Sequence, residues 1–307
     1  MDAGTGPTLI AGANGHLGRR LLARLSGTGA GARALVRSER AAGTIREDGL
    51  EPEIAIADYT DAEALRGAFE GCSGLVHLVG ILKEGPTTSY RAAHEETSTR
   101  FAAAAAAAGI GRIVYLSILG ADPDSPNACL ASKGRAERIL LDAPVPAVVI
   151  RLPMVLGPGD FASAALRGQA LAGVLPLVRG GATLEQPIDA EDVTAAVERA
   201  LTAADLTREA IDLAGPECLS HRDLVLRAAA LHERRPRIVP LPYGLVRLGV
   251  SLLARVSQYP PISLAMLEVL EHDDRVDAEA AAKRLGITLT PLDETLRRCV
   301  GPQVEAA

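Results

Sequence analysis

Short runs rich in valine, isoleucine and leucine alternate with longer stretches of helical periodicity through the first half of the chain. The runs predict strands at Thr8–Ala11, Ala32–Val36, Glu53–Ala57, Gly74–Leu78, Arg112–Leu116 and Ala147–Ile150. The stretches between them predict helices at His16–Ser26, Ser38–Glu47, Asp61–Phe69, Ser89–Ala108 and Ala131–Leu141. Six strands separated by helices predict an α/β fold with a doubly wound parallel sheet, because parallel strands need crossover connections.

The regular alternation ends after Arg151, where Pro153 and the turn Gly157-Pro158-Gly159 predict a loop. Later segments predict a helix at Asp189–Leu201, a strand at Ala210–Leu213, and helices at His221–Leu231, Tyr243–Val256, Ser263–Leu270, Asp277–Leu285 and Pro291–Cys299. We therefore expect two domains. The first spans residues 1–155 with return segments at about 187–214, and a smaller mixed C-terminal lobe for substrate or partner spans 156–186 and 215–307.

A glycine-rich loop lies between the first predicted strand and the first predicted helix. It reads Gly12-Ala13-Asn14-Gly15-His16-Leu17-Gly18 and has the spacing G-x-x-G-x-x-G. Glycines at such a junction serve a tight turn, a close approach of backbone to pyrophosphate, and close packing of helix on strand. The helix N-terminus adds N–H groups and a partial positive charge. The loop predicts a dinucleotide site on a Rossmann-type domain, bound by Gly12, Asn14, Gly15, His16, Leu17 and Gly18.

The ends of the next three strands indicate which dinucleotide is bound and which further residues contact it. The second strand ends at Arg37 with no carboxylate before Glu39, which favours NADP(H) over NAD(H) because an arginine accommodates a 2′-phosphate. The alternative is that Arg37 is one of many surface arginines. Asp58 and Tyr59 follow the third strand and are expected near the adenine, unless Asp58 only leads into the next helix. After the fourth strand, Leu78, Val79 and Gly80 are expected to let backbone pass the ribose and nicotinamide.

Composition narrows the class of protein. The 307-residue chain carries a net charge of −6, so no basic face is indicated for nucleic acid. Its four cysteines form no C-x-x-C pair and its histidines show no metal spacing, so we expect neither a disulfide framework nor a metal. Residues 1–6 lack a signal-peptide pattern, and the apolar stretch Leu241–Val256 is interrupted by Arg247 and Arg255. A cytoplasmic protein without a transmembrane segment is expected.

Several stretches resemble the short-chain dehydrogenase/reductase superfamily in its extended and atypical branches. They are similar to the nucleotide-binding accessory subunit of respiratory complex I and its free-standing bacterial relatives. The stretches are Ala34-Leu35-Val36-Arg37, His77-Leu78-Val79-Gly80-Ile81-Leu82, Leu116-Ser117-Ile118-Leu119-Gly120-Ala121-Asp122, Arg151-Leu152-Pro153, Gly157-Pro158-Gly159-Asp160 and Gln186-Pro187-Ile188. The resemblance runs from Thr8 to Leu213 and more loosely to the C-terminus.

The resemblance implies a catalytic serine, a tyrosine, and a lysine four residues after the tyrosine. Ser117 matches the serine and Lys133 the lysine, and both would also hold the cofactor. Pro153 matches the position whose backbone contacts the carboxamide of the nicotinamide. The tyrosine position holds Cys129, which is shorter than a phenol and a weaker hydrogen-bond donor. We expect it to be a small structural residue; the alternative is a thiolate activated by Lys133. No tyrosine is expected at the vacated place.

Two functions follow from this reading. The first is a protein that holds NADP(H), with tyrosine-dependent hydride transfer impaired or absent. For it, the resemblance implies an accessory role in a respiratory or quinone-related assembly at the periphery of the inner membrane. The second is an active NADP-dependent reductase, epimerase or dehydratase that acts on a small-molecule substrate with another acid or base. The helix Tyr243–Val256 is interpreted as core packing, with a docking face for a membrane-associated partner as the alternative. The resemblance also implies a homodimer through the helices Ser89–Ala108 and Ala131–Leu141.

Overall fold

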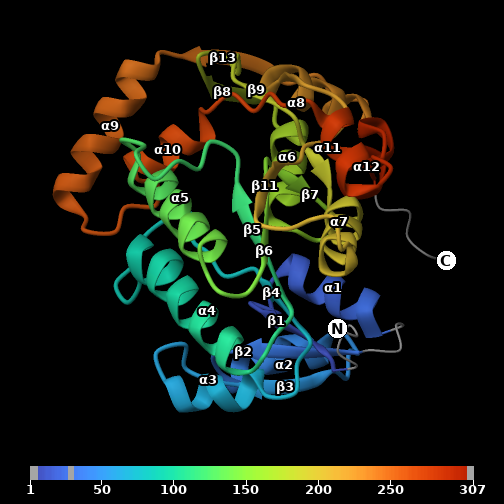
Figure 1. Cartoon of the computed structure of the whole chain (residues 1–307). Coiled ribbons are helices and arrows are strands. Elements are labelled where there is room, and N and C mark those ends of the chain that lie inside the picture. The colour runs from blue at the N-terminus through green and yellow to red at the C-terminus, as the bar shows by residue number, and fades with distance from the viewer. Residues whose placement is uncertain (1–5, 27–30, 303–307) are drawn as a thin grey trace. The chain divides into compact units, whose positions relative to one another are not determined.

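The computed structural model describes residues 6–26 and 31–302, and its first compact unit is built on a seven-stranded sheet (Figure 1). The strands are β1 Thr8–Ala11, β2 Ala32–Val36, β3 Glu53–Ile56, β4 Gly74–His77, β5 Arg112–Ile118, β6 Ala147–Leu152 and β11 Glu209–Asp212. The helices that connect them are α1 His16–Ser26, α2 Glu39–Glu47, α3 Ala62–Phe69, α4 Thr97–Ala107 and α5 Ala128–Leu141. The predicted doubly wound α/β fold is confirmed, and all six predicted strands are present.

The strand order is β11-β6-β5-β4-β1-β2-β3, so the chain builds outward from β1 to one edge and then returns at β4. The pairs that link β3, β2, β1, β4 and β5 are all parallel. In such a sheet a crevice forms beyond the carboxyl ends of β1 and β4, where the direction of winding reverses. The topology therefore brings together the segments that follow β1, β2 and β4.

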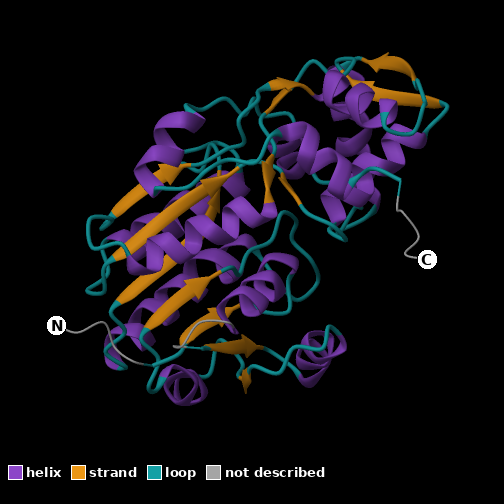
Figure 2. Cartoon of the chain, turned by 90° about the vertical axis from the view of Figure 1, so that its right-hand side faces the viewer, coloured by secondary structure: helices purple, strands orange, loops and turns teal. Residues whose placement is uncertain are grey.

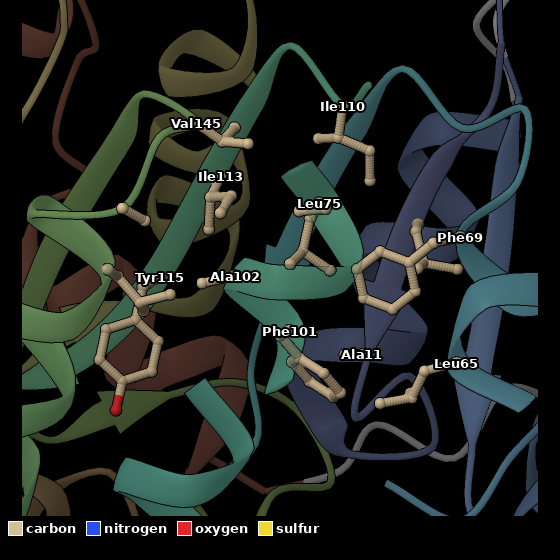
Figure 3. Packing of buried hydrophobic residues seen from close by; sticks show 14 of the residues in the cluster. Ala11, Leu65, Phe69, Leu75, Phe101, Ala102, Ile110, Ile113, Tyr115 and Val145 are labelled. Atoms are coloured by element: carbon tan, nitrogen blue, oxygen red, sulfur yellow. The ribbon is translucent and has the colours of Figure 1, made fainter. Parts of the chain in front are cut away.

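Alternate strand residues build the two hydrophobic layers. Leu9, Leu75 and Ile113 are fully buried and pack against helices α3, α4 and α5. Figure 3 shows Phe69 and Phe101 in this layer beside Leu75, and their ring centroids are 5.7 Å apart. The intervening strand residues are equally buried on the opposite face, which helices α1 and α2 cover. Figure 2 shows the helices on both sides of these strands.

The segment after β4 differs from the continuous helix predicted at Ser89–Ala108. A π-helix spans Arg91–Glu96 and passes directly into α4. The hydroxyl of Thr97 donates to the carbonyl oxygen of Ala92, 2.8 Å away, which supports the wider turn. Such widenings are frequent at functional sites. The widened turn holds His94 fully buried.

The second compact unit comprises residues 152–193 and 212–307, and the first comprises 1–151 and 194–211. The predicted division into 1–155 with 187–214 and 156–186 with 215–307 stays a prediction; these units begin and end at positions three to seven residues away from it. The elements of the second unit are β7 Val155–Leu156, α6 Phe161–Leu171, β8 Val174–Val178, β9 Leu184–Glu185, β10 Ile188–Asp189, β12 Leu219–Ser220, α8 His221–Ala230, β13 Arg237–Leu241, α9 Tyr243–Val256, α10 Leu264–Leu270, α11 Ala278–Leu285 and α12 Leu292–Cys299. Helix α7 Ala190–Thr202 runs from the second unit into the first.

Helix α6 and strands β8 and β13 are absent from the prediction. Strands β8 and β13 pair with each other in parallel, and each contains a proline, Pro176 and Pro240. Proline argues against a strand in sequence, although a two-stranded pair tolerates it at its edges. Helix α6 begins after Asp160, whose side chain accepts from the N–H of Ser163 at 2.6 Å. That N-cap was the available signal for a helix.

No helix in the described part of the chain is both long and apolar enough to span a bilayer. The stretch 241–256, predicted not to span a membrane, ends β13 and forms α9. Residues 1–5, for which no signal peptide is predicted, lie outside the described residues.

Candidate functional site

The glycine loop has the backbone geometry that its sequence predicts. Gly12 has a φ of +81°, in the left-handed region that glycine tolerates, and Gly15 N donates to Gly12 O at 3.0 Å. A Cβ on Gly18 would lie 2.6 Å from the carbonyl oxygen of Ala13. Helix α1 therefore packs on this loop as closely as a glycine allows, and its N-terminus faces the crevice end of β1.

A cavity of about 540 Å³ adjoins the loop. Its walls come from the segments that follow β1, β2 and β4, together with the first turns of α2 and Tyr59 after β3. The lining residues are Gly12, Asn14, Gly15, Arg37, Ser38, Arg40, Ala41, Thr44, Tyr59, Leu78, Val79 and Gly80. Eight of these are predicted cofactor residues: Gly12, Asn14, Gly15, Arg37, Tyr59, Leu78, Val79 and Gly80. The glycine cradle and this volume fit the pyrophosphate and adenosine portions of a dinucleotide.

Two arginines give one wall of the cavity a positive charge. Arg37 and Arg40 are exposed, and neither forms an ion pair with any described carboxylate. Arg33, by contrast, pairs with Glu53 at 2.9 Å and is engaged elsewhere. Ser38 caps α2 by accepting from Ala41 N, so the positive end of that helix lies on the same wall. This arrangement suits a phosphate group.

Of the two predicted adenine contacts, Tyr59 lines the cavity and Asp58 does not. Tyr59 is buried, with its ring centroid 5.7 Å from the Arg37 guanidinium carbon, and burial raises its pKa to about 12. Asp58 is exposed and is not a lining residue; its Oδ1 accepts from the N and Oγ1 of Thr60 at 2.8 and 2.9 Å. These bonds lower the pKa of Asp58. A contact of Asp58 with adenine stays a prediction.

Behind Gly80 lies a buried polar cluster that contains Lys133. Its Nζ donates to the carbonyl oxygen of Leu116 at 3.1 Å and lies 4.7 Å from the Tyr115 ring centroid. A Cβ on Gly80 would lie 2.9 Å from this Nζ, so the cavity wall and the lysine are in contact. Burial lowers the pKa of Lys133 to about 8, although nearby Cys129 and Glu137 oppose the shift. The lysine is thus poised to exchange a proton near neutral pH.

Helix α5 places Cys129 and Lys133 one turn apart. Its N-cap is Asn127, whose Oδ1 accepts from Cys129 N at 3.0 Å and from Leu130 N at 3.2 Å. Gly134 packs so closely on the backbone at Asp122 that no side chain would fit. These contacts hold α5 against the segment that follows β5. Ser117 lies near the end of β5 itself.

Cys129 is fully buried, and its Sγ lies 3.7 Å from the carbonyl oxygen of Ile81. Burial raises the pKa of its thiol to about 11, and this outweighs the opposing effects of Lys133 and of a hydrogen bond with the side chain of Tyr90. The thiol is therefore protonated at neutral pH. This argues for the structural interpretation of Cys129 and against a thiolate nucleophile.

Tyr90 lies beside Cys129. That no tyrosine stands at the place of the superfamily's tyrosine stays a prediction, but the Tyr90 side chain, from another element, hydrogen-bonds with Cys129. Its hydroxyl also donates to the carbonyl oxygen of Leu82 at 2.8 Å, and its ring stacks on that of His94 at 5.9 Å. Tyr90 precedes the π-helix, whereas Cys129 belongs to α5, so only the packing of these two helices reveals the pair.

Three buried polar atoms around Lys133 have no hydrogen-bond partner among the described residues. They are Ser117 Oγ, His94 Nδ1 and the Tyr115 hydroxyl. The His94 ring accepts from Ile81 N at 3.0 Å through Nε2, and burial lowers its pKa to about 3, so it is neutral. Unpaired buried polar atoms are rare and mark places for water or ligand groups. Ser117 and His94 are thereby available to a molecule bound beside the lysine.

Comparison with known proteins agrees with this geometry. The NAD(P)H-binding family profile matches residues 12–161. The chain is also 30% identical over 278 residues to the (4-alkanoyl-5-oxo-2,5-dihydrofuran-3-yl)methyl phosphate reductase of Streptomyces griseus, covering 89% of each chain. The chain belongs to the NAD(P)H-binding family. It is further 27% identical to the NADH dehydrogenase [ubiquinone] 1 alpha subcomplex subunit 9 of Arabidopsis thaliana, over 78% of this chain and 61% of that protein.

Among solved structures, this NAD(P)H-binding protein is similar to the NADPH-dependent quinone oxidoreductase QOR2 of Escherichia coli. The TM-score is 0.71 at 22% identity, over 94% of this chain and 98% of that one. At this identity the similarity concerns the fold. Two independent observations therefore agree: the family binds NAD(P)H, and the structure has a cavity beside the glycine loop.

The remaining predicted residues lie near this cavity or outside the first unit. His16 and Leu17 form the first turn of α1, and His16 Nε2 accepts from Arg20 at 2.9 Å. Pro153 belongs to the second unit, and its contact with the nicotinamide stays a prediction. Ser38, Arg40, Ala41 and Thr44 line the cavity without having been predicted as site residues. The sequence signal that could have identified them is Ser38, an N-cap residue that places the start of a helix close after the second strand.

Proposed function

We propose that the chain is an NADP(H)-dependent reductase of small molecules whose proton donor is not the residue at position 129. The observation that carries the proposal is that the cavity and the buried lysine adjoin the same residue. Gly80 lines the cavity that holds two arginines without ion pairs, and Lys133 lies directly behind that glycine. The similarity to a reductase over 89% of both chains supports it.

NADP(H), when bound, would supply the hydride. Arg37, Arg40 and the N-terminus of α2 would hold the 2′-phosphate, and the loop from Gly12 to Gly18 would hold the pyrophosphate. Lys133 would bind ribose hydroxyls and donate protons, and Ser117 would orient a substrate carbonyl. Cys129 leaves this set without a phenol at the usual position, so the superfamily's own route of proton transfer is closed.

A second candidate is a cofactor-holding accessory protein without turnover. The similarity to the Arabidopsis subunit favours it, as does α9. That helix buries only Val250 and exposes Leu245, Leu248, Leu252 and Val256, with Val256 83% exposed. The interpretation of this helix as core packing therefore fails for one of its faces. Such an apolar stripe suits docking to a membrane-associated protein at the inner membrane.

The cofactor assignment is tested with Arg37→Ala and NADPH fluorescence. Loss of one charge-assisted bond to the 2′-phosphate should weaken NADPH binding by about 10- to 100-fold and leave NADH binding unchanged. Arg66→Ala is the matched control, because Arg66 is an exposed arginine that pairs only locally with Glu63 at 2.8 Å. Equal losses for both nucleotides would contradict the NADP(H) preference, and absence of any nucleotide binding would overturn the proposal.

Turnover separates the two candidates. The wild-type protein loaded with NADPH is mixed with a small ortho-quinone or an aromatic aldehyde, and nicotinamide absorbance is followed. Oxidation of NADPH with formation of reduced product supports the reductase. Binding without oxidation supports the accessory protein.

A further inference from the structure

We propose that Tyr90 is the proton donor of this site. Helix α5 has no phenol at position 129, and Tyr90 supplies one from the segment before the π-helix. The inference rests on the proposed reductase function and names the residue that completes it. It depends on the contact of Tyr90 with Cys129, and not on any motif in the sequence.

The geometry gives Tyr90 the neighbours that a phenolic acid needs. Its hydroxyl lies between the carbonyl oxygen of Leu82, at 2.8 Å, and the Cys129 thiol. Cys129 in turn lies next to Lys133, since each affects the pKa of the other through its charge. The His94 ring stacks on the Tyr90 ring, and a Cβ on Gly80 would lie 3.6 Å from His94 Nε2. Tyr90 is thus linked to the cavity wall at Gly80 directly through His94, and through Cys129 to the neighbouring Lys133.

The other groups of the cluster are poorer donors. The Cys129 thiol is buried, with a pKa raised to about 11, and thiols are weak hydrogen-bond donors. The neutral His94 has a pKa near 3 and no cationic form to offer. Tyr115 is fully buried in the core layer, and burial raises its pKa well above the ordinary value. Tyr90 retains 6% exposure and is the phenol next to the thiol.

The small side chain at position 129 has a function in this arrangement. A phenol at position 129 would occupy the space that the Tyr90 hydroxyl now fills, because the two side chains already touch. The cysteine therefore makes room for a phenol that arrives from another element.

The proposed step is the reduction of a carbonyl. The hydride of the reduced nicotinamide forms the new C–H bond at the carbonyl carbon while the C=O π bond breaks. The carbonyl oxygen takes the Tyr90 proton in a new O–H bond, so the nicotinamide is oxidised and the substrate becomes an alcohol. The Tyr90 phenolate takes the proton of the Cys129 thiol with which it is hydrogen-bonded, and the resulting thiolate takes a proton from the neighbouring Lys133 ammonium group, which is then reprotonated from solvent.

Four variants test the proposal with an ortho-quinone or aromatic aldehyde as probe. Tyr90→Phe should lower kcat by about 10²- to 10⁴-fold while the dissociation constant for NADPH stays unchanged. The double variant Tyr90→Phe, Cys129→Tyr should regain part of that loss, because it returns a phenol to α5 and removes its competitor. Cys129→Tyr alone should be impaired by crowding with Tyr90. Tyr243→Phe, in the second unit, is the matched control and should leave turnover unchanged.

A readout that needs no turnover is the ultraviolet titration of the phenols in the nucleotide-free protein. The difference between wild type and Tyr90→Phe isolates the ionisation of Tyr90. Lys133→Met should move the Tyr90 ionisation to higher pH.

The inference is overturned if Tyr90→Phe retains turnover, or if Lys133→Met leaves the Tyr90 ionisation unchanged. Failure of the reductase proposal looks different, because the wild type itself would then bind NADPH without oxidising it. In that case, activity gained by Cys129→Tyr alone would show that no phenol serves the native site.

Discussion

At the scale of single residues, neighbouring backbone decides what a glycine is for. Gly18 lies in the first turns of α1 and is buried, and a Cβ there would lie 2.6 Å from Ala13 O and 2.7 Å from Ala13 Cα. Gly67 lies in the exposed face of α3 with nothing within 4 Å of its Cβ position. Both are helical glycines, yet only the first is required by packing.

We therefore expect opposite effects from two alanine substitutions. Gly18→Ala forces α1 away from the glycine loop and should cost about 1–3 kcal/mol of unfolding free energy. Because the same displacement disturbs the phosphate loop, NADPH affinity should fall as well. Gly67→Ala, the matched control, should stabilise by about 0.5–1 kcal/mol through lower backbone entropy in the unfolded chain. Denaturant titration and NADPH fluorescence measure both; a harmless Gly18→Ala would contradict the close-packing argument.

At the scale of elements, α5 matters because one helix carries both Cys129 and Lys133. Its start is set by Asn127, which satisfies two N–H groups that have no partner within the helix. Helix α3 is capped in the same way by Asp61, which accepts from Glu63 N at 3.0 Å and Ala64 N at 3.1 Å. The two caps are alike in chemistry but differ in what their helices hold.

Removing the two caps should separate stability from activity. Asn127→Ala and Asp61→Ala should each cost about 0.5–2 kcal/mol, as N-cap substitutions do. Only Asn127→Ala should also slow NADPH oxidation, because fraying of the first turn of α5 moves Cys129 and loosens Lys133. Denaturant titration combined with initial rates measures both effects. Equal rates in the two variants would mean that α5 holds its position without the cap.

At the scale of the whole molecule, histidines give the two units opposite responses to pH. In the first unit, burial lowers the pKa of His77 and His94, so both are neutral when folded. In the second unit, burial alone would lower the pKa of His221, but the hydrogen bond and charge of Glu185, 2.8 Å away, outweigh it and raise the pKa. The folded first unit therefore binds fewer protons than its unfolded chain below pH 6.5, and the folded second unit binds more above it.

We expect acid to destabilise the first unit and mild alkali to weaken the second. As pH falls below 6.5, each neutral histidine of the first unit should cost about 1.4 kcal/mol per pH unit until its folded pKa is reached. The His221–Glu185 contribution is fully present below 6.5 and is lost as pH rises through the raised pKa of His221. Hydrogen exchange of each unit on both sides of pH 6.5, corrected for intrinsic rates, measures this.

Two variants serve as controls for the pH response. His94→Gln keeps an acceptor for Ile81 N but cannot be protonated, so it should halve the acid response of the first unit. His221→Gln should remove the His221 part of the second unit's response, leave the part of His272, whose pKa the hydrogen bond of Asp274 also raises, and leave the first unit unchanged. Parallel responses of both units in the wild type would contradict the assignment.

The sequence by itself determined the features that arise from neighbours along the chain. The apolar run Leu9-Ile10-Ala11, the positive φ of Gly12, and the caps at Ser38 and Asp61 each depend on a few adjacent residues. For that reason the strands, the helix starts and the glycine loop of the first unit were predictable, together with most of the lining of the cavity. The resemblance to a family added Ser117 and Lys133.

Only the tertiary structure decided what distant segments do to one another. Tyr90 and Cys129 are far apart in sequence and meet because the π-helix and α5 pack together. The low pKa of Lys133 comes from burial, which no local pattern encodes. Strands β8 and β13 stabilise each other across a long separation, despite prolines that argue against either one alone. Packing free energy depends on the whole fold, and for that reason the proton donor that we propose could be inferred only from the tertiary structure.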